Sequence, residues 1–395
     1  MASKTDRAGR FIREPTGGFS AFVPKPLPPE PPLELSTDLS LSLSEADTAL
    51  GRLDGIVGVV PDPDLFVGMY VRREAVLSSQ IEGTQSSLGD LLQEELEPAP
   101  DGTTDVQDIV RYVAAMNYGL GRLDTLPLSL RLIREIHAEL LGSGRGATAT
   151  PGDFRKTQNW IGPPGATLSS ATFVPPSVPE MKNALDAFEK FLHQTQEHPT
   201  LIEVGLAHAQ FETIHPFLDG NGRVGRLLVT LLIVERGVLA RPLLYLSHYF
   251  KLHCLEYYDR LMAVRLEGDW EGWIKFFLDG VSTTAAEATR TAKLIFELRE
   301  RHRQMILDQN MGQHAMTLLS EMFRRPVIDV KRAAEIMGTS FATANGVVSK
   351  MEGIGILRET TGQRRFRKYR YEPYVELFED AGEDSTGPAE VTGPA

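Results

Sequence analysis

The sequence predicts a mainly α-helical protein with a winged helix-turn-helix near its C-terminal end. Three observations lead to this fold class. Segments with apolar residues at helical spacing flank a glycine-rich stretch near the middle of the chain. A segment bounded by Gly and Pro has the composition of one short β-hairpin. Toward the C-terminus, three helical segments precede one that alternates like a hairpin. With 395 residues, 42% of them hydrophobic, the chain is long enough for two or three domains.

The first 44 residues are expected to form an extended arm over a domain surface. They are rich in Pro, Leu and Ser. The run Leu27–Leu33 contains four prolines, and such a run cannot be helical.

Two helical segments follow, Met69–Leu77 and Leu88–Leu92, as their apolar spacing indicates. They place Ser78 and Glu82 one turn apart on one helix face. Taken alone, this pair is most simply explained by a solvated carboxylate near a helix end, with Gly83 as the cap.

The segments Asp153–Gly162 and Ala171–Pro176 are bounded by Gly and Pro and contain few helix formers. They predict a short β-hairpin. A surface hairpin without a function is one explanation of this pattern.

The stretch richest in chemistry runs from His215 to Arg226 and reads His-Pro-Phe-Leu-Asp-Gly-Asn-Gly-Arg-Val-Gly-Arg. The segment Leu201–Ile214 before it has helical apolar spacing, and Leu227–Val234 after it is nearly all apolar, so we expect a loop between two buried helices. Its glycines allow the backbone to approach an anion closely. The N–H groups of the following helix start then point at that anion, with the positive end of the helix dipole behind them.

The side chains of this stretch suit a triphosphate. Arg223 and Arg226 lie three residues apart and supply two guanidinium forks. Asp219 is a carboxylate of the kind that holds Mg²⁺ beside phosphate oxygens, and His215 titrates close to neutral pH. The implied chemistry is the attack of a deprotonated hydroxyl on a phosphate. A His before Pro, or a Gly-x-Gly, is by itself an ordinary turn, but a purely structural loop does not need the whole set.

The stretch matches every fixed position of the signature His-Pro-Phe-x-Asp/Glu-Gly-Asn-Gly-Arg-x-x-Arg, and the chain therefore resembles the Fic family. The resemblance implies an all-helical core and a nucleotidyltransferase that moves AMP from ATP to a hydroxyl side chain of a target protein, releasing pyrophosphate. It implies that His215 is the base, that Asp219 holds the Mg²⁺ ion bridging the α- and β-phosphates, and that Arg226 binds the γ-phosphate. The remaining nucleotide-binding positions would be Gly220, Asn221, Gly222, Arg223, Val224 and Gly225.

The upstream helix pair also resembles the family. Ser78, Glu82 and Gly83 match the inhibitory motif Ser/Thr-x-x-x-Glu-Gly/Asn that many Fic proteins carry before the catalytic core. A Glu82 carboxylate paired with Arg226 would occupy the guanidinium that the γ-phosphate needs, and ATP would bind weakly or with a misaligned α-phosphate. The resemblance thus implies an autoinhibited protein adenylyltransferase. Whether the same glutamate also helps to remove AMP stays open.

Two further features look like the family. In Fic proteins a hairpin called the flap covers the active site and clamps the target by strand pairing. Ile161 and Gly162 would lie at that clamp, and Pro163 stands where many relatives have a second glycine. Downstream, Tyr257 or Tyr258 is a candidate contact to the adenine, and His253 stands where a nucleotide-binding asparagine is expected.

The C-terminal region has the element order of a winged helix-turn-helix. An interdomain helix ends near Asn310, the segments 314–324, 330–337 and 341–353 read as three helices, and 355–371 alternates like a hairpin.

This region is also basic. Residues 324–371 hold eleven Lys and Arg against four Asp and Glu, a net charge of +7 in a chain of −12. The basic wing could follow DNA phosphates while the second helix reaches base edges. The wing residues are Arg364, Arg365, Arg367, Lys368 and Arg370, and the helix residues are Ser340, Thr343 and Asn345. Because winged helices equally serve as protein-interaction modules, DNA is a candidate partner and no more.

The expected domains are an N-terminal arm and inhibitory-helix region (1–100), a Fic catalytic core with its flap at 153–176 (101–310), the winged helix-turn-helix (311–375) and a disordered tail (376–395). Two function classes remain. The first is an autoinhibited adenylyltransferase that also modifies itself; the second is an ATP-sensing transcriptional regulator with vestigial catalysis. An intact His215 favours the enzyme, because a sensor needs no base. Phosphate or phosphocholine transfer are rarer variants within the family.

Composition indicates the cellular location of the protein. The chain has no uninterrupted apolar stretch of about eighteen residues and no cleavable signal pattern, and we therefore expect a cytoplasmic protein without membrane contact. Cys254 is the single cysteine, which excludes an internal disulfide and a cysteine-cluster metal site. Family habit makes a homodimer a further candidate. The target protein and its acceptor residue, Ser, Thr or Tyr, cannot be read from the sequence.

Overall fold

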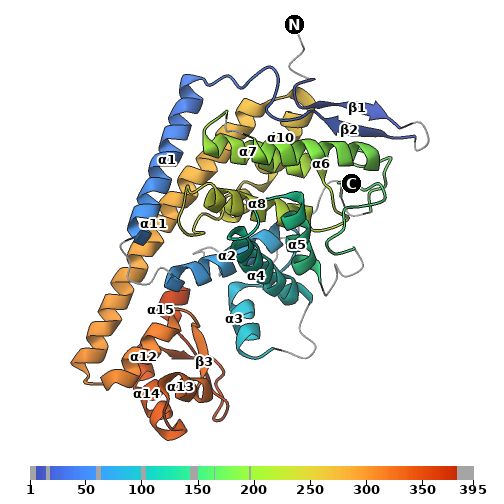
Figure 1. The fold of residues 1–395 in the computed structure, drawn as a ribbon. Helices are drawn as coiled ribbons and strands as arrows, with labels where there is room; N and C mark the ends of the chain where they lie inside the picture. The colour runs from blue at the N-terminus through green and yellow to red at the C-terminus, as the bar shows by residue number, and fades with distance from the viewer. Residues whose placement is uncertain are drawn as a thin grey trace.

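The computed structural model describes residues 6–14, 18–58, 64–98, 104–142, 150–163, 165–194 and 197–379. It is mainly helical, with two small antiparallel sheets, so the predicted fold class is confirmed. A large helical part occupies the upper region of Figure 1, and a smaller C-terminal part lies at the far end of the long helix α11, Trp270–Asp308. None of the helices in the described ranges combines the length and the apolar character needed to cross a membrane.

Two buried helices form the centre of the large part. They are α7, Thr200–Ile214, and α8, Asn221–Glu235. Every residue of α7 after Thr200 is buried, as expected for a helix that is covered on all sides. The surrounding helices are α4 (Thr104–Leu123), α5 (Leu130–Leu141), α6 (Val178–His193), α9 (Ser247–Leu252) and α10 (Cys254–Glu267). The glycine-rich stretch thus lies between two rigid central helices.

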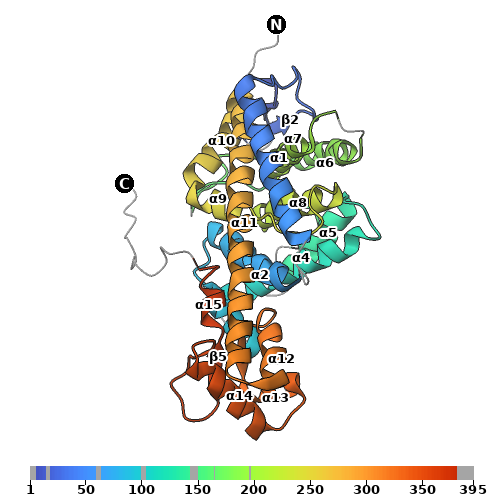
Figure 2. The ribbon, with the colours of Figure 1, turned by 90° about the vertical axis from the view of Figure 1, so that its left-hand side faces the viewer.

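Helix α1, Thr37–Gly58, runs beside α11 in both ribbon views (Figures 1 and 2). At about 1.5 Å per residue, the 39 residues of α11 span roughly 58 Å. The stripe of α1 that includes Leu39, Leu50 and Leu53 is buried. The prediction of an extended arm through residue 44 is therefore wrong from Thr37 onward. Leu39 and Leu43 continue a helical stripe that packs against the core, and its main partner is α11, far along the chain.

The arm also contains a β-hairpin that the sequence analysis missed. Strands β1, Gly9–Arg13, and β2, Ser20–Pro24, pair in antiparallel register. Phe22 is fully buried, and its backbone N–H donates to the carbonyl of Val174 at 2.9 Å. The hairpin thereby packs against the segment that precedes α6. Neither strand shows the apolar and polar alternation that would have predicted it.

The segment predicted as the inhibitory-helix region contains α2, Asp64–Ile81, and α3, Leu88–Leu96. A capping box starts α3, because the Ser87 hydroxyl accepts from the N–H of Asp90 while the Asp90 carboxylate accepts from the N–H of Ser87. Helix α2 ends at Ile81, so Glu82 stands in the turn just beyond it.

The C-terminal part combines three helices with a three-stranded sheet. Its helices are α12 (Gly312–Met322), α13 (Val330–Met337) and α14 (Phe341–Gly353), and its strands, in the order β3-β5-β4, are β3 (Val327–Asp329), β5 (Lys368–Arg370) and β4 (Arg358–Glu359). The helices predicted at 330–337 and 341–353 have those bounds, and the one predicted at 314–324 begins and ends two residues earlier. These are the elements of a winged helix-turn-helix in their expected order, and the assignment itself stays a prediction.

The chain end packs back onto the inhibitory-helix region. After α15, Glu372–Val375, the ring of Phe378 meets the ring of Tyr70 on α2 at 5.1 Å between centroids. The predicted disordered tail at 376–395 is therefore wrong for its first four residues, which turn onto the protein. Its remainder, 380–395, lies outside the described residues.

Candidate active site

Helices α7 and α8 hold the two ends of the glycine-rich stretch. His215 follows α7 directly with φ 48° and ψ 60°, and Gly220 precedes α8 with φ 77°, so both positions are left-handed. The Asn221 side chain closes the loop between them. Its amide oxygen accepts from the N–H of Phe217 at 2.8 Å, and its amide nitrogen donates to the Phe217 carbonyl at 2.9 Å. Asn221 thus holds the loop closed. The loop predicted over 215–226 is shorter in the structure and spans 215–220, because 221–226 already belong to α8.

The strained turn at His215 is supported from the flap segment. The Nε of Arg155 and the amide of Asn159 both donate to the His215 carbonyl, at 3.1 and 3.2 Å. A non-glycine residue in the left-handed region is costly and persists only where neighbours hold it. Arg155 and Asn159 supply that support, although sequence analysis assigned them no role.

The His215 imidazole is set to act as a neutral group. Its Nδ1 is buried without a hydrogen-bond partner among the described residues, and it lies 4.0 Å from a carboxylate oxygen of Glu212. Burial, reinforced by the nearby Arg265 guanidinium, lowers the pKa of His215 to about 3. The expectation that His215 titrates close to neutral pH is therefore wrong, because burial disfavours its charged form. The imidazole is neutral at physiological pH and keeps a nitrogen lone pair that can accept a proton, as a weaker base than a free imidazole.

Glu212 is the second titratable group beside His215. Burial, opposed by Arg226 and reinforced by Glu82, raises the pKa of Glu212 to about 7. One of its carboxylate oxygens, Oε1, is buried without a hydrogen-bond partner in the described chain. Sequence analysis missed this residue because a Glu on a core helix lies outside the signature. Its one signal was a charged residue, like Glu203, within a largely apolar segment.

The start of α8 presents the anion-binding groups. As the first helical residues, Asn221, Gly222 and Arg223 have N–H groups without an acceptor inside the helix. Arg223 lies among them with its Nε buried and without a partner in the described chain, while its terminal nitrogens approach Asp219 at 3.5 Å and Asp108 at 4.0 Å. Unused, buried guanidinium donors at a helix start fit a phosphate group.

The structure brings the predicted inhibitory motif, Ser78 to Gly83, onto Arg226. The Nε of Arg226 donates to the Ser78 hydroxyl at 2.8 Å, and its Nη2 donates to the Ser78 carbonyl at 2.9 Å and to Glu82 Oε1 at 2.7 Å. Although burial raises the pKa of Glu82, the Arg226 guanidinium outweighs that effect, and the pKa lies below its ordinary value. The pair is therefore ionised at neutral pH.

The Glu82 carboxylate lies over the glycine of the helix start. A Cβ added to Gly222 would stand 2.2 Å from Glu82 Oε1, closer than any real contact allows. Glu82 therefore occupies the surface of α8 that an anion would use. Gly83, with φ 93°, turns the chain away directly afterwards.

Asp219 has the properties of a metal ligand that works with phosphate. Its side chain is 51% exposed, and its Oδ1 is held by the N–H of Gly220 at 2.6 Å. No cluster of three His, Cys, Asp or Glu suited to a metal occurs in the described ranges. A single carboxylate at an anion site is the donor set that Mg²⁺ uses when phosphate oxygens and water complete its shell, so the residues present fit that ion.

The predicted flap is smaller than a hairpin of strands. Ile161 and Phe173 form one antiparallel bridge, with N–H to carbonyl distances of 2.8 and 3.0 Å, and no longer ladder occurs in the described part of 153–176. Gly162 fits tightly beneath the tip, since a Cβ there would meet Ala166 at 2.9 Å. The prolines at 163, 175 and 176 cannot donate to a ladder, which limits the pairing.

The two residues expected at the adenine lie on α9 and α10. His253 is exposed at their junction, and its ring meets that of Tyr249 in a tilted arrangement at 4.5 Å between centroids. Tyr258 is 43% exposed and packs beside Tyr257, which is buried and hydrogen-bonded to His208 at 2.9 Å. Tyr258 is therefore the tyrosine of this pair that a ligand can reach. Val224, by contrast, is fully buried in the core.

Gly225 offers a stability test of the site. An alanine Cβ at this position would stand 2.3 Å from Glu212 Oε1. We expect Gly225→Ala to lower the free energy of unfolding by about 1 to 3 kcal/mol, because a buried carboxylate must move. Gly51→Ala in α1, where an added Cβ meets nothing within 4 Å, should instead stabilise by about 0.5 to 1 kcal/mol. Urea unfolding of both variants measures the difference, and equal effects would contradict the crowding at Gly225.

Comparison with known families identifies two matching regions. Residues 41–121 match the family described as "Fic/DOC family N-terminal", and residues 127–233 match "Fic/DOC family". The second region contains His215 and the start of α8, and the first contains Ser78 and Glu82. Both functional segments of the site thus lie inside the matched residues.

Curated relatives agree with these matches. The chain is 30% identical over 212 residues to "Protein adenylyltransferase Fic" of Culex quinquefasciatus, which covers 52% of this chain and 39% of that protein. It is 31% identical over 160 residues to the protein of the same name from Aedes aegypti, covering 40% of this chain and 28% of that protein. The chain therefore spans well under half the length of these relatives.

A solved structure shares the fold. A Fic family protein from Desulfovibrio desulfuricans G20 superimposes with a TM-score of 0.56 at 17% identity, covering 86% of this chain and 97% of that chain. The likeness concerns the fold, since the identity is low. Given the two matched regions, with which the curated relatives agree, the chain contains a Fic/DOC N-terminal domain and a Fic/DOC domain.

Proposed function

We propose that the protein is an autoinhibited protein adenylyltransferase that uses ATP and Mg²⁺. The observation that carries the proposal is the convergence at the start of α8 of a neutral imidazole, unused helix N–H groups and a buried guanidinium with an unpaired Nε. The relatives named protein adenylyltransferase support the class of reaction. A cytoplasmic location and a homodimer stay predictions from the sequence and from family habit.

In the proposed reaction, His215 removes the proton from a Ser, Thr or Tyr hydroxyl of the target. The hydroxyl oxygen then bonds to the α-phosphorus of ATP, the bond from that phosphorus to the oxygen bridging to the β-phosphate breaks, and pyrophosphate leaves. The first-turn N–H groups of α8 and the fork of Arg223 hold the phosphates. Asp219 would hold Mg²⁺, which neutralises phosphate charge when bound. The edge at Ile161 and Gly162 would pair with the backbone of the target.

The inhibitory part of the proposal rests on the ionised pair of Glu82 and Arg226. Because Arg226 already gives its Nε and Nη2 to Ser78 and Glu82, it has few donors left for a γ-phosphate. The Glu82 carboxylate also repels the polyphosphate from the surface above Gly222. We therefore propose that the conformation described is an inhibited one.

Transfer from two labelled forms of ATP separates AMP transfer from its alternatives. The Glu82→Gly protein is incubated with Mg²⁺ and with ATP labelled at either the α- or the γ-phosphate. Label retained on protein from the α-position alone establishes AMP transfer, and self-modification provides an acceptor in the absence of a known target. Label retained from the γ-position would establish phosphate transfer and overturn the proposal.

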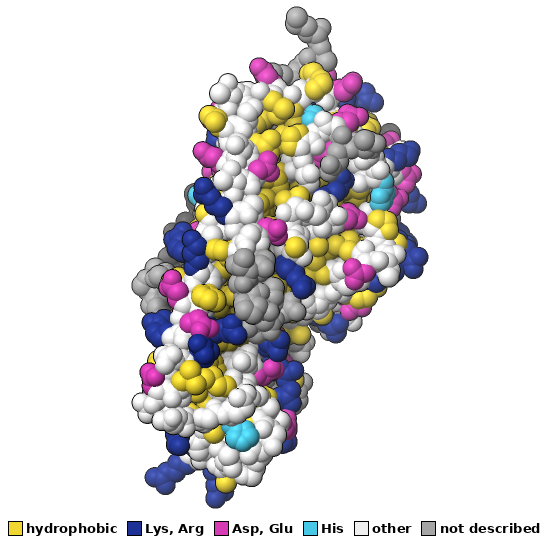
Figure 3. All heavy atoms as spheres, turned by 60° about the vertical axis from the view of Figure 1, so that its left-hand side comes forward, with side chains coloured by type: hydrophobic (Ala, Val, Ile, Leu, Met, Phe, Trp, Pro, Cys, Tyr) yellow, Lys and Arg dark blue, Asp and Glu magenta, His cyan; other side chains and the backbone are white. Residues whose placement is uncertain are grey.

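A second candidate function, DNA binding by the C-terminal part, has its own supporting observation. Phe366 and Phe341 are 88% and 61% exposed, and they line one cavity of about 550 Å³ together with Arg364, Arg365 and Lys331. Aromatic rings exposed among cations suit nucleic acid. In Figure 3, Lys and Arg side chains project from the lower end of the molecule, where this part lies.

The residues predicted to read DNA bases already make hydrogen bonds within the protein. Ser340 caps α14 by accepting from the N–H of Thr343, and the two hydroxyls lie 3.0 Å apart. The amide oxygen of Asn345 accepts from Arg367 at 2.9 Å. The arginines expected to contact the DNA phosphates therefore support DNA binding better than the residues expected to read the bases do.

We expect duplex DNA to bind the full chain at low salt, and Arg364→Ala/Arg365→Ala to weaken that binding. Loss of two phosphate contacts should lower the slope of log K against log salt by about 2. The matched control is Arg10→Ala/Arg13→Ala, which removes the same charge from β1 at the opposite end of the molecule (Figure 1). Titration of labelled duplex at three salt concentrations gives both slopes. If both double variants weakened DNA binding equally, the binding would come from nonspecific charge attraction and not from the C-terminal part.

A further inference from the structure

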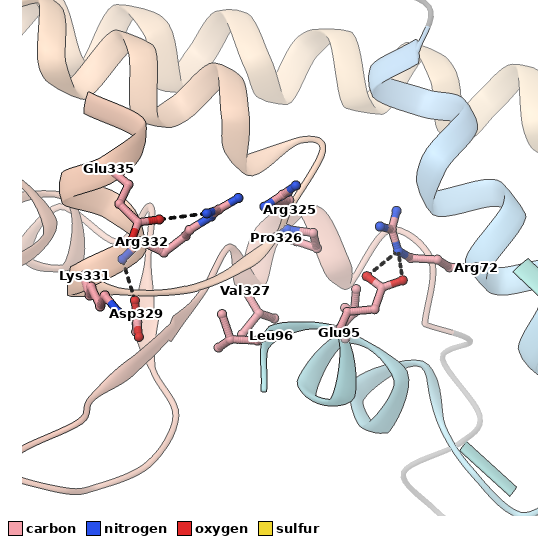
Figure 4. A pocket seen from close by; sticks show the side chains of 11 residues that line it. Arg72, Glu95, Leu96, Arg325, Pro326, Val327, Asp329, Lys331, Arg332 and Glu335 are labelled. Carbon is pink, nitrogen blue, oxygen red and sulfur yellow. Dashed lines mark hydrogen bonds and ion pairs between the residues drawn. The ribbon is translucent and has the colours of Figure 1, made fainter. Parts of the chain in front are cut away.

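A cavity of about 490 Å³ separates the inhibitory-helix region from the C-terminal part. Figure 4 shows its two sides. Arg72 of α2 and Glu95 of α3 stand on one side, and Arg325 and Arg332 extend toward the same space from the other. Two contacts outside the cavity lining join the same two parts of the chain. Lys368 of β5 pairs with Glu97 after α3 at 2.6 Å, and the Phe378 ring packs on Tyr70 of α2.

Four cationic side chains line this cavity, namely Arg72, Arg325, Lys331 and Arg332, against three carboxylates. Each carboxylate is already engaged. Both oxygens of Glu95 accept from the Nε of Arg72, Glu335 pairs with Nη1 of Arg332 at 2.7 Å, and Asp329 caps α13 through the N–H of Arg332. The lining carboxylates thus have little capacity left for a further cation.

The cations, in contrast, keep unused donors. Arg72 donates to Glu95 through Nε alone, and Arg332 donates to Glu335 through Nη1 alone. Arg325 makes only a long contact of 3.8 Å to Glu321, which lies outside the cavity lining. No carboxylate of the described ranges lies within 4 Å of the Lys331 ammonium. Several guanidinium and ammonium groups therefore face one cavity with their remaining donors free, and their mutual repulsion favours an anion between them.

We propose that this interdomain cavity binds a small molecule that carries two or more linked phosphate groups. Guanidinium forks on opposite walls match a linked oligophosphate better than a single phosphate, because one anion must reach both sides. The volume lies within the range of small-molecule sites. Leu96, Pro326 and Val327 lie between the charged walls in Figure 4 and provide an apolar surface for the rest of the ligand.

Because the cavity lies beside α2, a bound ligand would affect the inhibition by Glu82. This step rests on the proposed function. Arg72 lies six residues before Ser78 on α2, about 9 Å along the helix at 1.5 Å per residue. An anion held between Arg72 and the C-terminal part would fasten α2 in the position where Ser78 and Glu82 hold Arg226. A ligand that binds this arrangement better than any other shifts the population toward it. The bound molecule would thus strengthen the inhibition.

Calorimetric titration of the full chain with tripolyphosphate tests the site. Wild type is compared with Arg325→Ala/Arg332→Ala and with the control Arg10→Ala/Arg13→Ala. We expect the cavity variant to lose at least tenfold in affinity and the control to keep wild-type binding. Tripolyphosphate that binds at α8 is retained by the cavity variant, so the difference between the two titrations isolates the cavity. A parallel titration with GTP distinguishes the sources: tighter binding than tripolyphosphate indicates a nucleotide, and equal binding indicates an oligophosphate alone.

Amide hydrogen exchange tests the coupling without any enzymatic readout. Tripolyphosphate should slow exchange in 64–81 of wild type and leave that segment unchanged in the cavity variant. Thermal unfolding of each variant first establishes that it folds. Binding by the cavity variant equal to that of wild type overturns the proposal. Because neither measurement needs AMP transfer, failure here and failure of the proposed enzymatic function are separate results.

Discussion

Glu82→Gly is expected to raise AMP transfer by about a hundredfold or more. The change removes the carboxylate that lies 2.7 Å from Arg226 and above Gly222, so the guanidinium and the helix start become available to the phosphates. Correct placement of the α-phosphate supplies most of the rate in such a reaction, and a displacement of about 1 Å can cost a factor of about 100. Initial rates of label transfer from α-labelled ATP measure the effect.

Two further variants test whether the charge of Glu82 causes the effect. Glu82→Gln keeps the size of the side chain and removes its charge, so we expect an intermediate rate. Glu97→Gly makes the same exchange just after the end of α3, where the carboxylate is exposed and far in sequence from α8. It should leave the rate at the wild-type level. Activation by Glu97→Gly equal to that by Glu82→Gly would show that loosening of the helix pair, and not release of Arg226, causes the gain.

His215→Ala introduced into the Glu82→Gly protein is expected to reduce transfer by about 10² to 10⁴ fold. Positioned proton transfer contributes a factor of this size, and His215 is the imidazole next to the helix start. Its Nδ1 has no partner in the described chain, so the loss should not come from unfolding. Transfer rates at saturating ATP measure the effect, and calorimetric ATP binding to the same protein should stay within a few fold of its parent.

The matched control is His193→Ala in the same Glu82→Gly background. His193 is an exposed imidazole at the end of α6, away from the α7–α8 junction. It should leave the transfer rate unchanged. Retention of full activity by the His215→Ala protein would refute a base at this position and favour the ATP-sensing alternative.

Local patterns predicted those elements whose partners lie close in sequence. The helices at 330–337 and 341–353 have their predicted bounds, because Asp329 and Ser340 cap their starts and Gly338 ends the first of them. The long-range elements were the ones missed. Helix α1 is buried against α11 more than two hundred residues away, and β2 packs against Val174. A pattern within a short window does not show a partner at such a distance.

In the candidate site, too, the residues close in sequence were predicted and the distant ones were missed. The signature identified the residues of 215–226 because the loop and the helix start are contiguous, and backbone geometry alone brings their groups together. It did not reveal Arg155 and Asn159, which support the turn at His215, or Glu212, whose meaning depends on burial. The residue types at these positions are common in sequences, and only their packing makes them part of the site.

The sequence by itself thus determined the family signature and the helical class. It also determined which residues the short stretch 215–226 brings together. Only the tertiary structure decided that Glu82 lies on the glycine of the helix start, that the His215 nitrogen is buried and neutral, and that arginines of α2 and of the C-terminal part face one cavity. The physical reason is the range of the forces involved. Turn and helix preferences act over a few residues, whereas burial, pKa shifts and the meeting of charges depend on segments that only the folded chain brings together.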